Sequence, residues 1–156
     1  MIYKAKIKKS NYKIAIIISK WSIDVCERLL KGTLKGLEEY TNLENVDIFW
    51  VPGAFEIPRI AKTILTTKSD KYDAIITLGC VIRGETTHYD YVCNEVARQV
   101  SDLGVNYNIP VIFGVLTTEN INQALVRSDI DNIVKNKGYY CALAALEMID
   151  ILNQIK

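Results

Sequence analysis

Residues 74–91 read AIITLGCVIRGETTHYDY and carry the clearest structural signal in the chain. The first five are apolar and mostly β-branched, which is typical of a buried strand, and the residues from Thr87 onward have the spacing of an amphipathic helix. Gly79 and Gly84 stand between these two parts and indicate a turn. The stretch is therefore predicted to be a strand–turn–helix unit, and α/β sheets bind ligands at the carboxyl ends of such strands.

The same alternation of strand and helix continues on both sides of this unit. Strands are predicted at residues 13–19, 46–51, 74–81 and 110–116, and helices at residues 23–40, 56–66, 87–106, 121–127 and 139–155. Short connections between alternating strands and helices favour parallel crossover units. The predicted fold class is α/β, a three-layer sandwich with a mostly parallel four-stranded sheet. A further short strand is predicted at residues 2–7, where lysine and apolar residues alternate.

Length and composition fit one globular domain over residues 1–156. Lys plus Arg number 19 and Asp plus Glu number 18, so no nucleic-acid partner is expected. The four cysteines lack the close spacing of a zinc site, and no metal is predicted. The apolar run at residues 14–18 is far shorter than the ~20 residues that span a bilayer, and no signal peptide is evident. We therefore expect a cytoplasmic protein without membrane contact.

Three of the predicted strands are followed by segments that could form a site. Trp21 follows the first strand, residues 53–56 follow the second, and residues 84–88 follow the third. In a parallel sheet these segments lie at the same edge and can converge. Residues 84–87 offer backbone N–H groups and hydroxyls at a helix start, which suits a phosphate, although plain turn chemistry is the alternative.

Single residues in these segments each have a functional and a structural interpretation. His88 is the only histidine, and the helix dipole there favours the neutral imidazole of a general base; a surface or capping role is the alternative. Trp21 could stack on a planar ligand or cover the core edge. Glu56 could accept hydrogen bonds from ligand hydroxyls or complement the helix dipole. Arg127 and Lys137 could bind an anion or be solvated charges.

Four motifs occur in a distinctive order along the chain. They are VPGAFEIP at 51–58, LGCVIRG at 78–84 with THYDYV at 87–92, PVIFGVLTTEN at 110–120, and the segment from NKG at 136–138 to ALEM at 145–148. In this order they resemble the successive motifs of the 6,7-dimethyl-8-ribityllumazine synthase family. The resemblance extends from residue 19 into the C-terminal helix and implies a flavodoxin-like fold.

The resemblance also implies a reaction. The family is a transferase that condenses 5-amino-6-ribitylaminopyrimidinedione with 3,4-dihydroxy-2-butanone 4-phosphate. The product is 6,7-dimethyl-8-ribityllumazine, and the step is the penultimate one of riboflavin biosynthesis. No metal or redox cofactor is implied. The alternative is a non-catalytic homologue that binds flavin or forms a shell.

Site residues follow from the resemblance position by position. Trp21 replaces an aromatic residue, usually phenylalanine, that stacks on the substrate ring. Contacts with the ring and the ribityl chain are implied for Ala54, Phe55, Glu56, Cys80, Val81 and Ile82. The phosphate is expected to bind Glu85, Thr86 and Arg127, and His88 is expected to move protons.

The resemblance further implies a homo-oligomer. Phe113, Arg127 and Lys137 would enter the site from a neighbouring subunit. The family forms rings of five subunits, and in some members twelve rings build a 60-subunit shell. Those members tend to have a compact turn with glycine between the last two helices, whereas residues 128–136 form a longer segment without glycine. A free pentamer is therefore predicted in preference to the shell.

Overall fold

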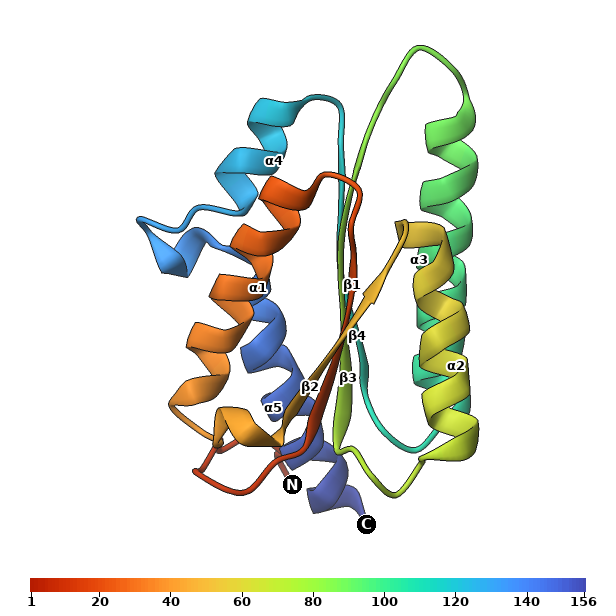
Figure 1. The fold of residues 1–156 in the computed structure, drawn as a ribbon. Coiled ribbons are helices and arrows are strands. Elements are labelled where there is room, and N and C mark those ends of the chain that lie inside the picture. Colours follow the sequence, from red (N-terminus) through yellow and green to blue (C-terminus); the bar gives the residue numbers. More distant parts are fainter.

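Four parallel strands form the central sheet in the order β2-β1-β3-β4 (Figure 1). They are β1 (Ile14–Ser19), β2 (Val46–Val51), β3 (Ala74–Ile82) and β4 (Val111–Thr118). The computed structural model describes all of residues 1–156. Because every strand pairing is parallel, the carboxyl ends of all four strands lie at one edge of the sheet. The predicted parallel sheet is confirmed.

Five α-helices cover the two faces of this sheet. They are α1 (Ile23–Glu38), α2 (Ile57–Thr67), α3 (His88–Asn106), α4 (Ile121–Arg127) and α5 (Lys137–Ile155). Helices α1, α4 and α5 lie on one face, and α2 and α3 lie on the other (Figure 1). The result is the three-layer α/β sandwich that the sequence predicts, with flavodoxin-like architecture. No helix combines the length and apolar character required to cross a membrane.

The position of β1 in the core explains why its apolar residues do not alternate with polar ones. All residues of β1 are buried, and their side chains divide between the two faces of the sheet. Ile14, Ile16 and Ile18 belong to the core under α1 and α5, whereas Ala15 and Ile17 belong to the core under α2 and α3. A strand buried on both faces reads as a continuous apolar run. Burial of each isoleucine side chain contributes about 1.5–3 kcal/mol.

The start of α5 is fixed by a close approach to α1. A Cβ atom on Gly138 would lie only 2.0 Å from the carbonyl oxygen of Leu29, so no larger residue fits there. Thr33 in α1 donates a hydrogen bond of 3.0 Å to the Gly138 carbonyl. Lys137 is the first residue of α5 and directly precedes this contact.

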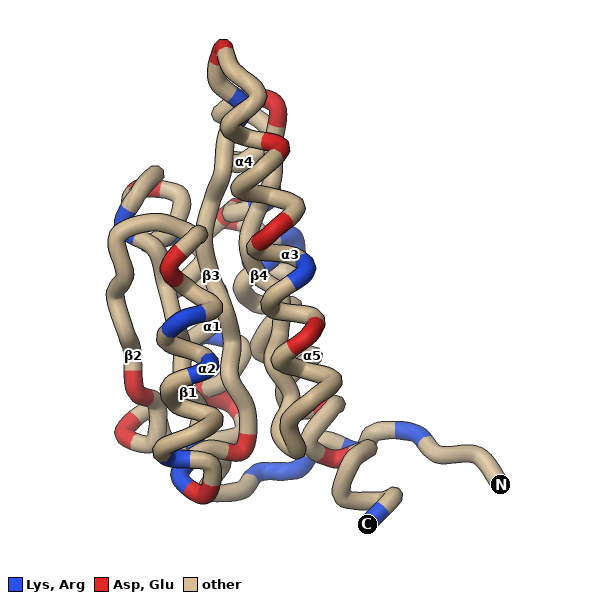
Figure 2. Tube along the Cα trace, turned by 90° about the vertical axis from the view of Figure 1, so that its right-hand side faces the viewer, with Lys and Arg blue, Asp and Glu red and all other residues tan.

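The N-terminal segment corrects one prediction. Residues 1–13 form no strand, so the strand predicted at residues 2–7 is wrong for the single chain. A strand needs a neighbouring strand to pair with, and this segment instead contacts the end of α5. The backbone N–H of Lys6 donates to Asp150 Oδ2 at 2.8 Å, and Gln154 Nε2 donates to the Lys4 carbonyl at 3.0 Å. Figure 2 shows the segment extending away from the body of the protein, and the charged residues of this segment are all lysines.

Candidate active site

A cavity of about 530 Å³ opens at the carboxyl edge of the sheet. Its volume is in the range of small-molecule sites. It is lined by Trp21, Ser22, Ala54, Phe55, Glu56, Cys80, Val81, Ile82, His88, Tyr91 and Val92. These residues follow β1 and β2, end β3 and begin α3, so segments far apart in the sequence meet here. The convergence predicted for the three strand ends is observed.

Trp21 forms an exposed wall of this cavity and is held by its backbone. Ser22 has φ 58°, the only non-glycine residue with positive φ, and this conformation costs about 1–3 kcal/mol. The backbone N–H groups of Lys20 and Trp21 both donate to the Pro52 carbonyl at 3.2 Å. The indole also lies close to Gly53, where a Cβ would be 2.9 Å from its Cε3 atom. The Trp21 backbone is thus anchored and its indole lies against Gly53, while the residue remains 65% exposed.

Glu56 is oriented by a hydrogen bond at the start of the following helix. The backbone N–H of Gly53 donates to Glu56 Oε2 at 2.9 Å. The bond closes the short 3₁₀ helix Ala54–Glu56, which leads directly into α2. Since a carboxylate has about four acceptor positions, Glu56 can accept further hydrogen bonds from a ligand in the cavity. Both sequence interpretations of Glu56, helix-start acceptor and ligand contact, fit this geometry.

The end of β3 supplies an apolar floor. Cys80 is buried, and Val81 and Ile82 are partly buried beside it. Burial raises the pKa of the Cys80 thiol to about 12, so the thiol stays protonated near neutral pH and is a poor nucleophile. All four cysteines are free. No group of three or more His, Cys, Asp or Glu side chains is arranged to hold a metal ion.

His88 is the first residue of α3 and lines the cavity. Tyr91 and Val92 line it as well, three and four positions later, which places them one helical turn further on the same face. Sequence reasoning did not select these two residues, although the helical spacing from His88 was a signal that could have found them. Ser22 was missed too, because nothing in the sequence indicates that this serine adopts a left-handed backbone conformation.

Residues 84–87 lie at the rim and are all exposed. Glu85 and Thr86 do not line the cavity. The Thr86 hydroxyl accepts a long hydrogen bond of 3.4 Å from the His88 backbone N–H. A Cβ on Gly84 would meet nothing within 4 Å, so there is open space around the loop. The backbone N–H groups of residues 84–87 and the N-terminus of α3 remain accessible to an anion.

The remaining predicted residues lie elsewhere in the same chain. Phe113 and Lys137 line a second cavity of about 450 Å³ between β4 and α5. Arg127 ends α4 and lines neither cavity. Its Nη1 donates to the Gln123 carbonyl at 3.0 Å, and it takes part in no ion pair. One chain therefore does not bring these three residues to His88.

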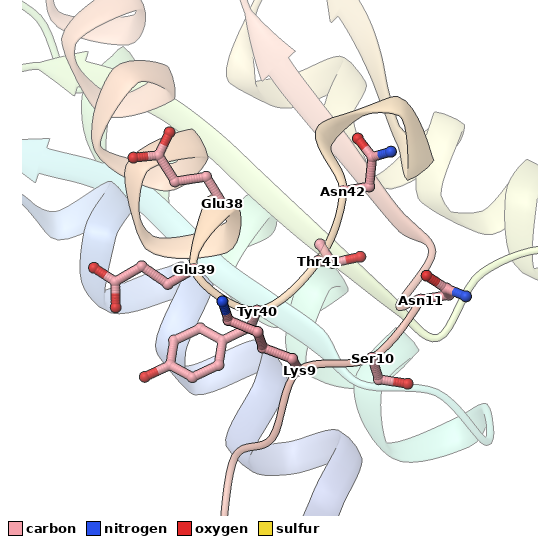
Figure 3. Close-up of a pocket in the computed structure, with 8 residues that line it drawn as sticks. All are labelled: Lys9, Ser10, Asn11, Glu38, Glu39, Tyr40, Thr41 and Asn42. Atoms are coloured by element: carbon pink, nitrogen blue, oxygen red, sulfur yellow. The ribbon is translucent and has the colours of Figure 1, made fainter.

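A further cavity of about 540 Å³ lies between the segment before β1 and the end of α1 (Figure 3). Its lining is mostly polar and exposed and includes Lys9, Glu38 and Glu39. The segment that forms it precedes β1, so the cavity is at the amino edge of the sheet, opposite the candidate site. It contains none of the predicted site residues, and the cavity at the carboxyl edge is the better candidate.

The chain matches a model of a known protein family. A family model described as 6,7-dimethyl-8-ribityllumazine synthase matches residues 11–153. The matched range contains all four strands and the residues that line the candidate cavity and the cavity between β4 and α5. It agrees with the resemblance seen in the four sequence motifs.

Proposed function

Since the chain belongs to the 6,7-dimethyl-8-ribityllumazine synthase family, a transferase family of riboflavin biosynthesis, we propose which substrates it joins and how. The proposed substrates are 5-amino-6-ribitylaminopyrimidinedione and 3,4-dihydroxy-2-butanone 4-phosphate. The observation that carries this proposal is the cavity in which an exposed indole, an oriented carboxylate and the only imidazole meet. These groups suit a planar ring, a chain of hydroxyls and a proton transfer.

The pyrimidine substrate is assigned to the inner part of the cavity. Its ring is proposed to stack on Trp21 above the apolar floor of Val81 and Ile82, since an aromatic face favours a planar partner. The ribityl hydroxyls are proposed to donate to Glu56, whose carboxylate is held by the Gly53 N–H. Ala54 and Phe55 belong to the same wall, and Cys80 lines the cavity from its buried position in β3. The ring would thereby present its free amine toward His88.

The chemistry requires proton transfers and positioning. The amine attacks the ketone of the second substrate and water leaves, which gives an imine. Inorganic phosphate leaves by elimination, and attack of the ribitylamino nitrogen closes the ring with loss of a second water. No net oxidation or reduction occurs. His88 is proposed to accept and return the protons, a contribution that is typically ~10²–10⁴-fold.

The phosphate group is assigned to the rim at residues 84–87. Accessible N–H groups at the start of α3 favour an anion, and the Thr86 hydroxyl is an additional donor. Glu85 is exposed and must direct its carboxylate away from the phosphate. A positive partner is required there, and we assign that part to Arg127 of a neighbouring subunit, whose planar guanidinium can bind phosphate through two hydrogen bonds.

The separation of the two groups of residues supports an assembled site. Phe113, Arg127 and Lys137 lie away from the cavity of their own chain, as residues that serve a neighbour would. Phe113 is 38% exposed on the edge strand β4, and Tyr140 on α5 is exposed next to Lys137. Exposed apolar side chains on a sheet edge are typical of an interface. Head-to-tail contacts of this kind close into a ring.

We propose that the assembly is a free pentamer. The segment after α4 projects from the body of the domain (Figure 1). It is ordered by the Asp129 carboxylate, which accepts from the N–H groups of Asp131 and Asn132 at 2.9 and 3.1 Å. A defined projection would obstruct contacts between rings. Light scattering should find a pentamer in ordinary buffers, and a 60-subunit particle would overturn this part of the proposal.

The test of the proposed reaction is direct. The purified protein is mixed with both substrates, and lumazine fluorescence and inorganic phosphate are followed together. The proposal requires both products in equal amounts. A protein that binds the ring without forming lumazine would instead be the flavin-binding homologue. The broad exposed face of Trp21 is the observation that favours that second candidate.

Riboflavin is expected to quench the fluorescence of Trp21, because a flavin ring in the cavity would stack on the indole. Trp21→Ala should remove most of the quenching, and Trp21→Tyr should retain more riboflavin binding than Trp21→Ala. Trp50 lies in β2 and does not line the cavity, so Trp50→Phe is the matched control and should keep the quenching. If quenching persists unchanged in Trp21→Ala, the ring does not stack there.

A further inference from the structure

The rim loop at residues 84–87 has little support of its own. Residues 84–86 form no backbone–backbone hydrogen bonds, and all four residues are exposed. The only side-chain contact within the loop is the long bond from the His88 N–H to the Thr86 hydroxyl. A loop that must present N–H groups to a phosphate needs a fixed conformation, so its support must come from the residues at its two ends.

Arg83 supplies contacts at both ends of this loop. Its backbone N–H donates to the Thr118 carbonyl at the end of β4, at 2.9 Å. Its Nη1 and Nη2 atoms donate to the two oxygens of Asp90 at 3.1 and 3.0 Å, in the first turn of α3. Its Nε donates to Glu119 Oε2 at 2.7 Å, just after β4. The guanidinium carbon also lies 4.3 Å from the centre of the Tyr89 ring.

These contacts join three parts of the fold at one side chain. Tyr89 and Asp90 follow His88 directly in α3, while Glu119 belongs to the connection from β4 to α4. The Arg83 guanidinium holds the pKa of the Asp90 carboxyl below its ordinary value, so the pair is ionised near neutral pH. Only the planar fork of arginine can bind one carboxylate through two bonds and another through Nε.

Exposure argues against a mainly stabilising role for this network. The side chains of Arg83 and Asp90 are 36% and 47% exposed, and pairs this open to solvent contribute little to global stability. Their effect is on the orientation of the segment between them. The pair of Arg98 and Glu95 provides a comparison, because it also has two hydrogen bonds, from Nε and Nη2 at 3.1 and 2.8 Å, but joins residues of a single helical turn.

We propose that Arg83 is a positioning residue, whose side chain fixes the rim loop and the first turn of α3 so that the loop N–H groups and His88 face the phosphate substrate. The assignment rests on the proposed function for the identity of that substrate. Arg83 acts through Asp90 and Glu119, which engage three of its five N–H donors, and not as a phosphate ligand.

The test compares Arg83→Gln, Asp90→Asn and the matched control Arg98→Gln. Arg83→Gln is expected to raise KM for the butanone phosphate roughly 10- to 100-fold and to speed amide exchange at the start of α3, where the Asp90 N–H donates to the Thr87 carbonyl. KM for the pyrimidine substrate should change little. Arg83→Lys should show the same raised KM and faster exchange, since lysine lacks the planar guanidinium that makes these hydrogen bonds. Arg98→Gln should match the unmodified protein in both measurements.

Asp90→Asn separates positioning from direct phosphate binding. If Arg83 positions the loop, this variant should reproduce the raised KM and the faster exchange of Arg83→Gln. If Arg83 binds phosphate itself, freeing it from Asp90 should leave KM unchanged or lower it, and the proposal is overturned. Amide exchange and the affinity for inorganic phosphate are measured without turnover. A normal exchange pattern in Arg83→Gln would therefore overturn the positioning role even if the chain formed no lumazine.

Discussion

Replacing Arg127 with alanine is expected to lower kcat/KM for the butanone phosphate by roughly 10²–10³-fold, with most of the loss in KM. Removing one partner of a charge-assisted pair costs about 2–5 kcal/mol, and each 1.4 kcal/mol corresponds to a factor of about ten. The expectation follows from the free state of Arg127, which makes one hydrogen bond, to the Gln123 carbonyl, and no ion pair in its own chain. Steady-state kinetics with varied phosphate substrate measures the loss.

Two further variants make this result specific. Arg98→Ala removes an exposed arginine that is paired with Glu95 on α3 and should leave the kinetics unchanged. His88→Ala should lower kcat by about 10²-fold or less, because water can partly replace a proton-transfer group. An unchanged KM in Arg127→Ala, together with complete loss of activity in His88→Ala, would show that the two roles are wrongly assigned.

Asn136→Ala is expected to lower the free energy of unfolding by about 2–5 kcal/mol, since buried groups lose their partners. The Asn136 side chain is completely buried. Its Oδ1 accepts from the N–H groups of Gly138 and Tyr139 at 2.8 and 3.4 Å. Its Nδ2 donates to the carbonyls of Arg28 and Asp129, each at 3.0 Å. This one amide therefore caps α5 and joins it to α1 and to the preceding segment.

Asn132→Ala is the matched control for that measurement. Asn132 is exposed, and its side chain does not cap the 3₁₀ helix that follows it. Its replacement should change the free energy of unfolding by less than about 0.5 kcal/mol. Urea unfolding of both variants at one protein concentration gives the comparison, because assembly makes stability depend on concentration. Equal effects of the two substitutions would mean that the Asn136 hydrogen bonds contribute nothing.

The regular elements were predictable because their physical signals are local. Apolar β-branched runs located all four strands, and helical spacing located the five helices to within a few residues. Differences at the ends have specific causes. Helix α5 begins at Lys137, two residues before the predicted start, because the side chain of Asn136 caps it. The predicted strand at residues 2–7 fails because pairing requires a neighbour that the single chain does not offer.

The site was predictable only in part, for physical reasons. Convergence of the strand ends follows from a parallel sheet, so the surroundings of Trp21, Glu56 and His88 could be expected. The support behind them could not, because it depends on contacts across the fold. The left-handed backbone of Ser22 and the reach of Arg83 to Glu119 are examples, since neither follows from local spacing. The role of Arg127 came from the family resemblance alone.

The claim that one site is built by two copies of the chain can be tested by mixing two inactive proteins. One carries Trp21→Ala and His88→Ala, and the other carries Arg127→Ala and Lys137→Ala. When equal amounts of the two are refolded together, about a quarter of the sites should combine an intact cavity with intact neighbouring residues, since each condition is met by half of the subunits. Lumazine formation should then return to about a quarter of the rate of the unmodified protein. A mixture no more active than its separate components would contradict the shared site.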